Sequence, residues 1–170
     1  EELWRTDGTE NGTYMVKDIM PGYGGSSIGP QRTGEGSDYP PVTIMGNNLY
    51  FHANDGTHGQ ELWKSDGTEA GTVMVKDIRS GSDCHSRAGV SGTAATGDIV
   101  DFDADHGPNG FELWKSDGTA NGTVMVKDIR SGSDSSGPRF FTAAGNTLYF
   151  RADDGTHGAE LWKSDGTANG

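Results

Sequence analysis

The octapeptide ELWKSDGT occurs three times in this chain, at residues 61–68, 112–119 and 160–167, and the near copy ELWRTDGT occupies residues 2–9. The glutamates that open the four copies, Glu2, Glu61, Glu112 and Glu160, are separated by 59, 51 and 48 residues. A period of this length is typical of repeat arrays and propellers. We therefore describe residues 1–170 as one array, with units 2–60, 61–111 and 112–159 and a partial unit 160–170.

Each unit contains four short segments rich in β-branched and aromatic residues, and glycine, asparagine and aspartate separate them. In the C-terminal part of the chain these segments are TVMVKDI at 123–129, RFFTAA at 139–144, TLYFRA at 147–152 and AELWKS at 159–164. Such segments are typical of strands, and no segment has a sustained helical period. Three hairpin-length connections followed by the long RSGSDSSGP at 130–138 predict a repeated four-stranded antiparallel meander.

A four-stranded meander about every 50 residues is the unit of a β-propeller. The sequence therefore predicts an all-β fold, a β-propeller-type array of four-stranded antiparallel blades with about three blade equivalents in this chain. Strands fall along the chain in groups of two, four, four and three, which gives 13. We expect Trp4, Trp63, Trp114 and Trp162, which recur at one position of the motif, to pack between blades.

The repeated motif DGTxxGT lies where the strand ELWKS must reverse into the next strand. Aspartate and threonine side chains bond to turn amides, and glycine accepts positive φ. The sequence therefore predicts a structural hairpin clamp in every unit. Its members are Asp7, Asp66, Asp117, Asp165, Thr68, Thr119 and Thr167. The alternative is a carboxylate binding site on each repeat.

The composition excludes several classes of partner. With 25 acidic and 13 basic side chains the net charge is −12, and such a surface repels phosphate backbones and anionic lipids. No apolar run approaches the length of about 18 residues that a membrane span needs. We therefore expect neither nucleic-acid binding nor membrane insertion, and the single Cys84 excludes an intramolecular disulfide.

The meander predicts one edge of the array where acidic and histidine-bearing loops meet the long crossovers between units. Because loops carry function more often than strands do, we place the candidate binding site there. Its residues are Asp55, His58, Asp105, His106, Asp153, Asp154 and His157. Calcium is the metal to test, since hard cations prefer oxygen ligands, and its candidate ligands are Asp153, Asp154 and Glu160.

Other chemistry has no support in the sequence. One cysteine and histidines far apart offer no zinc cluster. No nucleophile elbow or fixed spacing marks a catalytic triad, and most acidic residues are repeated rather than unique to one unit. We predict no enzymatic activity and, calcium aside, no cofactor.

The motif ELWKSDGT, followed by GTVMVKDI and LYFRADDGTHG, resembles the bacterial ELWxxDGT repeat proteins. The resemblance covers nearly the whole chain. It implies a propeller-like repeat and an extracellular or cell-surface location in bacteria, and that family has no well-defined activity to carry over.

Three classes of function follow. The first is a non-enzymatic scaffold, adhesion or binding module of an exported or cell-surface protein. The second is a carbohydrate-binding, lectin-like propeller, which would use exposed aromatic side chains at the loop edge, with Tyr23 and Tyr39 as candidates. The third is part of a polysaccharide-processing enzyme with its catalytic residues elsewhere. The expected partners are the rest of a longer propeller chain or copies of itself, and a glycan or protein ligand.

Overall fold

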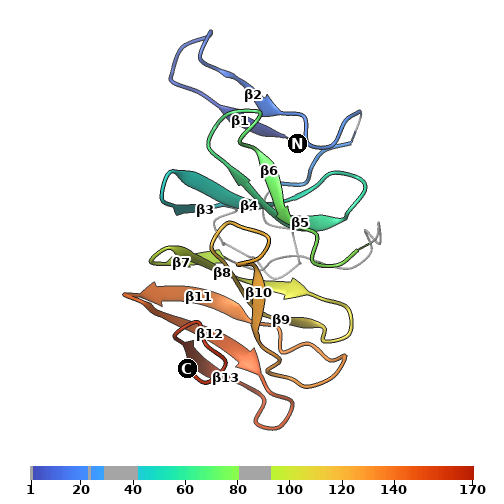
Figure 1. Cartoon of the computed structure of the whole chain (residues 1–170), viewed down its shortest axis with the longest axis vertical. Helices are drawn as coiled ribbons and strands as arrows, with labels where there is room; N and C mark the ends of the chain where they lie inside the picture. The colour runs from blue at the N-terminus through green and yellow to red at the C-terminus, as the bar shows by residue number, and fades with distance from the viewer. Residues whose placement is uncertain (1, 23, 29–41, 81–92) are drawn as a thin grey trace.

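The chain folds into antiparallel β-sheets. The computed structural model describes residues 2–22, 24–28, 42–80 and 93–170 (Figure 1). Within these residues there are thirteen strands and no helix, and therefore no helix that could cross a membrane. The strands are β1 (Leu3–Arg5), β2 (Tyr14–Lys17), β3 (Val42–Met45), β4 (Asn48–Asn54), β5 (Gln60–Ser65), β6 (Val73–Lys76), β7 (Thr93–Thr96), β8 (Ile99–Asp105), β9 (Phe111–Ser116), β10 (Val124–Lys127), β11 (Arg139–Ala144), β12 (Thr147–Asp153) and β13 (Ala159–Ser164).

The strands form four separate sheets in chain order. Sheet 1 is β1-β2, sheet 2 is β3-β4-β5-β6, sheet 3 is β7-β8-β9-β10 and sheet 4 is β11-β12-β13. All strand pairs are antiparallel. The sheets follow one another along the long axis of the molecule, from sheet 1 at one end to sheet 4 at the other, and do not close into a ring (Figure 1). The predicted all-β class and the strand grouping are confirmed.

A tight hairpin opens each of sheets 2, 3 and 4. The registers Met45↔Asn48, Thr96↔Ile99 and Ala144↔Thr147 leave two residues in each loop. The first loop residue is glycine each time, with φ of 59°, 62° and 61°. Two-residue hairpin loops need a positive φ at this position, which glycine adopts without strain.

The fourth strand of sheets 2 and 3 is shorter than the sequence pattern predicts. Residues 123–129 were expected to be extended, but β10 ends at Lys127. The Ile129 amide donates to Oε2 of Glu112 at 2.8 Å instead of to a neighbouring strand. The chain therefore leaves the sheet before its last apolar residue.

The core lies between the sheets, because alternate residues of each strand point to opposite neighbours. Phe51 packs in the cluster towards sheet 1, whereas Tyr50 belongs to the cluster shared with sheet 3. Leu148 and Phe150 of β12 face sheet 3 together.

The repeated tryptophans follow the same arrangement with one exception. Trp63 and Trp114 are buried, and Trp162 is half-buried in the cluster between sheets 3 and 4. Trp4 is 61% exposed. Its expected packing between sheets is wrong for the described residues, because no described sheet covers that side of sheet 1.

The first strands of sheets 2, 3 and 4 lie side by side, with β3 against β7 and β7 against β11. The hydroxyl of Thr43 donates to the carbonyl of Thr93 at 3.1 Å across this contact. Successive sheets are therefore joined along their first strands as well as through their faces.

Candidate functional site

Every unit folds its DGT turn with the same hydrogen bonds. In sheet 2, Oδ1 of Asp66 accepts from the amide of Thr68 at 2.9 Å and from its hydroxyl at 2.7 Å. The Thr68 hydroxyl oxygen in turn accepts from the amide of Gly71 at 3.0 Å. These bonds lower the pKa of the aspartate, with the threonine hydroxyl as the largest cause. The equivalent bonds occur at Asp7, Asp117 and Asp165, with Thr9, Thr119 and Thr167 as donors.

The second glycine of DGTxxG has a steric reason to be glycine. A Cβ at Gly71 would lie 2.0 Å from Oδ1 of Asp66, and one at Gly122 would lie 2.1 Å from Oδ1 of Asp117. Any side chain there would displace the carboxylate from the turn. Glycine is therefore required at this position of the motif because the aspartate carboxylate packs against the returning backbone.

The basic residue of ELWKS connects one sheet to the next, which sequence reasoning missed. Nζ of Lys64 donates to the carbonyl of Gly118 in sheet 3 at 2.8 Å. Nζ of Lys115 donates in the same way to Gly166 in sheet 4 at 2.7 Å. Arg5 takes this place in sheet 1 and donates to Gly67 at 3.2 Å. The clamp turn is thus also the acceptor of a contact between units.

A second set of lysines forms a parallel series of contacts. Lys17 donates to the carbonyl of Thr72 at 2.8 Å, and Lys76 donates to that of Thr123 at 2.7 Å. Lys17 ends β2 (YMVK) and Lys76 ends β6 (VMVK), and both threonines follow the clamp glycine in the next unit. Each described junction between sheets therefore has at least one ammonium or guanidinium bound to a turn carbonyl.

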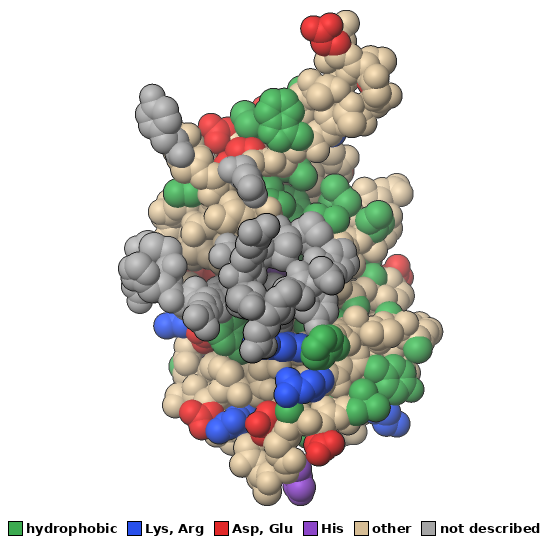
Figure 2. Space-filling view, turned by 180° about the vertical axis from the view of Figure 1, so that it is seen from behind, with side chains coloured by type: hydrophobic (Ala, Val, Ile, Leu, Met, Phe, Trp, Pro, Cys, Tyr) green, Lys and Arg blue, Asp and Glu red, His purple; other side chains and the backbone are tan. Residues whose placement is uncertain are grey.

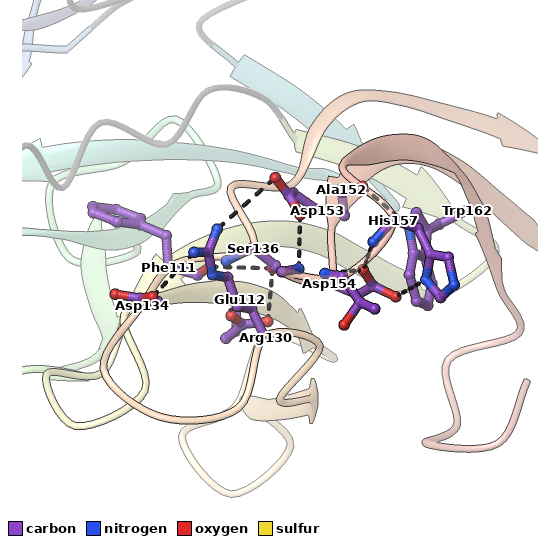
Figure 3. A network of polar contacts seen from close by, with 12 residues as sticks. Phe111, Glu112, Arg130, Asp134, Ser136, Ala152, Asp153, Asp154, His157 and Trp162 are labelled. Atoms are coloured by element: carbon purple, nitrogen blue, oxygen red, sulfur yellow. Dashed lines mark hydrogen bonds and ion pairs between the residues drawn. The ribbon is translucent and has the colours of Figure 1, made fainter.

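The glutamate that opens the motif binds the crossover to the next sheet. Glu112 is fully buried; its Oε2 accepts from the Ile129 amide at 2.8 Å and its Oε1 from the Ser136 amide at 2.9 Å (Figure 3). Glu2 binds the amides of Ile19 and Ser26 in the same manner, each at 3.0 Å. The partners of the glutamate lie 17 and 24 residues further along the chain in both units.

Glu61 binds the amides of Ile78 at 3.1 Å and Arg79 at 3.3 Å. Burial raises the pKa of Glu61 to about 7 and also raises that of Glu112. These carboxylates have perturbed pKa values and lie near the candidate edge, which are features of functional groups. Their oxygens are nevertheless occupied by backbone amides, so their role in the fold is structural.

The loops DGTHG contain the candidate residues Asp55, His58, Asp154 and His157 as two local pairs. Oδ1 of Asp55 accepts from the amides of residues 57 and 58, each at 2.8 Å, and its Oδ2 lies 2.6 Å from Nδ1 of His58. Asp154 makes the same contacts, with 2.7 Å to Nδ1 of His157 (Figure 3). The structure therefore brings each aspartate to its own histidine, and among the described residues it assembles no site from different loops.

The two pairs differ in exposure, and their pKa shifts have identifiable causes. Burial alone would raise the pKa of Asp55, but hydrogen bonds from His58 and Thr57 outweigh it and lower the pKa. The hydrogen bond from His157 lowers the pKa of Asp154, and the same bond raises that of His157. The side chain of His157 is 75% exposed and that of His58 is 38% exposed. His157 is thus the more accessible ring.

The middle loop, ADHGPNG, has a different arrangement. Asp105 forms an ion pair with Arg79 of the preceding crossover and accepts from the Gly107 amide at 2.7 Å. His106 is exposed, and its ring centroid lies 5.9 Å from that of Trp114. No Asp–His pair forms in this loop.

Asp153 occupies the equivalent place in sheet 4. It accepts from the Gly155 amide at 2.7 Å, and its Oδ2 lies 3.8 Å from a guanidinium nitrogen of Arg130 (Figure 3). Arg130 also binds Asp134 at 3.0 Å. The crossover that leads from sheet 3 to sheet 4 therefore contacts the acidic loop of sheet 4.

The calcium candidates do not converge in the described part of the chain. Asp153 and Asp154 are engaged as above, and Glu160 is exposed on β13. Across residues 2–22, 24–28, 42–80 and 93–170, no three acidic, histidine or cysteine side chains are grouped as metal ligands. Calcium binding stays a prediction. The aromatic candidates Tyr23 and Tyr39, and Cys84, lie outside the described residues.

His52 on β4 is a buried titratable residue that the sequence did not single out. Both ring nitrogens lack a hydrogen-bond partner, and burial lowers the pKa of the ring to about 3. Its ring lies 6.1 Å from that of Phe102 in the neighbouring sheet. It therefore packs as a neutral aromatic ring within the core.

Comparison with known proteins adds little to this picture. No family model and no curated protein matches the sequence. Two computationally designed proteins of known structure, Ika8 and Ika4, are similar in fold, each with a TM-score of 0.40. Ika8 is 18% identical over 75% of this chain and 33% of its own; Ika4 is 17% identical over 79% of this chain and 71% of its own. Likenesses this distant carry no argument about function.

Proposed function

We propose that this chain is a non-enzymatic, β-propeller-type repeat module of an exported or cell-surface bacterial protein. It acts as a scaffold for adhesion. The candidate edge, which carries the loops of Asp55, Asp105 and Asp154, is the surface presented to other molecules. In this proposal each four-stranded sheet is a blade. The side-by-side contacts of β3 with β7 and of β7 with β11 support such an arrangement, because the first strands of a propeller's blades lie nearest its axis.

The observation that carries the proposal is the set of hydrogen-bond partners of the repeated polar residues. The glutamate binds the crossover, the lysine binds the next sheet and the aspartate closes its own turn. Repeated polar groups with such partners stabilise the array and are not free to act on a substrate. This supports a structural module rather than an enzyme.

Accessible polar groups of the candidate edge lie in the loops between the second and third strands of sheets 2, 3 and 4. Asp154 and His157 in the last of these loops are held in a defined geometry while the histidine ring stays exposed. This loop is therefore the part of the described edge best suited to contact a partner. The resemblance to ELWxxDGT repeat proteins supports the surface location.

Two measurements test the proposal. An antibody against the chain should label intact cells of the source bacterium, and external protease should remove that signal. On a glycan array, with and without calcium, the protein should give no signal that depends on the Asp154 loop. The matched variants are Asp154→Asn and Asp165→Asn, because these aspartates cap turns at opposite ends of β13.

A calcium-dependent glycan signal that Asp154→Asn abolishes and Asp165→Asn preserves would replace the scaffold assignment with the lectin assignment. Labelling only after the cells are opened would contradict the surface location.

A further inference from the structure

The outer face of sheet 4 exposes residues that are buried at the same position in the other sheets. Leu161 is 79% exposed, whereas Leu62 and Leu113 are each 1% exposed. Tyr149 is 38% exposed, whereas Tyr50 is 2% exposed. Large exposed apolar residues on one sheet face mark an interaction surface. We define Tyr149, Leu161 and Lys163 as the tail face.

The internal junctions show what normally covers this face. Leu62 of sheet 2 packs with Phe102 and Trp114 of sheet 3. Leu113 of sheet 3 packs in the same way with Leu148 and Phe150 of sheet 4. A leucine at this position is therefore covered by the aromatic face of the following sheet.

The polar part of the junction is repeated as well. Lys163 occupies the position of Lys64 and Lys115, whose ammonium groups bind the turn carbonyls of the following sheet. Lys163 is exposed and has no hydrogen bond within the described residues. The tail face thus presents both the apolar and the cationic halves of an internal junction.

Sheet 1, at the other end, presents the complementary surface. Trp4 is 61% exposed and Met15 is 40% exposed, and the two are paired across β1 and β2. The equivalent pair, Trp63 and Met74, packs towards the preceding sheet. We define Trp4, Met15 and the turn of Gly8, which corresponds to the acceptor Gly67, as the head face. In the face that Figure 2 shows, hydrophobic side chains are exposed both in the upper and in the lower part of the molecule.

We propose that the tail face of one copy of this chain binds the head face of a second copy. Leu161 packs against Trp4 of the second copy as Leu62 packs against Trp114, and Lys163 donates to the Gly8 turn as Lys115 donates to Gly166. The interface is head-to-tail, so each copy keeps one free head and one free tail. This inference goes beyond the proposed adhesion function and does not depend on any ligand of the loop edge.

Three variants of the whole chain test this proposal by sedimentation velocity at micromolar concentrations. Leu161→Asp places a charge on the tail face and Trp4→Asp places one on the head face. Ile44→Asp is the control, because Ile44 is 68% exposed but lies on β3, away from both faces. Because all three side chains are exposed, the variants should give the circular dichroism spectrum of the unmodified chain. We expect association of the unmodified chain and of Ile44→Asp, weakened about tenfold or more by either end substitution.

The decisive sample is the mixture of Leu161→Asp with Trp4→Asp. The first variant keeps its head and the second its tail, so together they should form a dimer containing one of each and nothing larger. An unmodified chain that stays monomeric overturns the proposal. So does a mixture of two folded variants that fails to assemble. Loss of association with Leu161→Asp alone, while Trp4→Asp associates with itself, would show a tail-to-tail contact and would also overturn it.

Discussion

Replacement of Glu112 by glutamine tests whether the buried carboxylate of the repeat holds the crossover between sheets. Oε2 of Glu112 accepts from the Ile129 amide at 2.8 Å and the Ser136 hydroxyl at 2.7 Å, while Oε1 accepts from the Ser136 amide at 2.9 Å. Glutamine has one acceptor oxygen. When that oxygen takes the place of Oε2, the side-chain NH₂ group faces the Ser136 amide. That amide keeps its bond to the Phe111 carbonyl at 3.1 Å, and the NH₂ group is left as a buried donor without an acceptor.

The expected loss follows from the number of donors left unpaired. One buried donor without a partner costs about 1–3 kcal/mol, so Glu112→Gln should lower the free energy of unfolding by about 2 kcal/mol. Glu112→Ala leaves the Ile129 amide unpaired, whereas the Ser136 amide keeps its bond to the Phe111 carbonyl, and the change should cost about 1–3 kcal/mol. In a chain of 170 residues one kcal/mol changes Tm by about 2–4 °C, so the glutamine variant should melt about 4–8 °C lower.

Thermal melts followed by circular dichroism measure this difference. They should be compared above neutral pH, because burial raises the pKa of Glu112 and a protonated carboxyl would resemble glutamine more closely. Glu160→Gln is the matched control. Glu160 opens the same motif but is exposed and has no hydrogen bond in the described residues, so its replacement should change stability by less than about 0.5 kcal/mol. Equal melting of the two glutamine variants would refute the role assigned to Glu112.

Three further predictions use other parts of the repeat. Because burial raises the pKa of Glu61 to about 7 from 4.5, its contribution to stability is full below pH 4.5 and is lost as the pH rises through 7. Between pH 4.5 and pH 7 the free energy of unfolding of the unmodified chain should fall by up to about 3 kcal/mol relative to that of Glu61→Gln. Denaturant titrations of both proteins at pH 4.5 and pH 7 measure this difference. Gly122→Ala should lower Tm because the added Cβ displaces the Asp117 carboxylate; an unchanged Tm would mean that the turn relaxes freely. Lys115→Met should speed amide hydrogen exchange in the 164–170 turn, whereas Lys163→Met in dilute protein should not.

Much of the fold could be predicted from the sequence, because strand signals in this chain are local. Alternating residues such as Leu148, Tyr149 and Phe150 give the faces of β12 directly, and the glycine-led loops give the hairpins. Repetition then fixes which strands belong to one sheet. The ends of strands were less predictable, since the loss of Asp128 and Ile129 from β10 depends on a glutamate in another strand.

The contacts between sheets were missed because their partners are far apart in the sequence. Nothing near Lys64 indicates that it binds a carbonyl 54 residues away. A signal was nevertheless present for the glutamates. Glu2, Glu61 and Glu112 are each followed after 17 residues by an isoleucine whose amide they bind. A spacing between a glutamate and an isoleucine that is kept while the units otherwise diverge therefore indicates a hydrogen bond between them.

The same octapeptide has two different environments, and its neighbours decide which one it adopts. In a stack of repeats each unit contacts only the units beside it, so stability is a sum of unit and junction terms. Leu62 and Leu113 are buried by a following sheet, and Leu161 in an identical sequence context is exposed. The identity of these residues therefore reflects a junction that a unit forms when it has a neighbour, even in the copy where no neighbour is described. The exposed Leu161, which is buried in its counterparts Leu62 and Leu113, is for that reason the most direct indication of where another unit can pack against this chain.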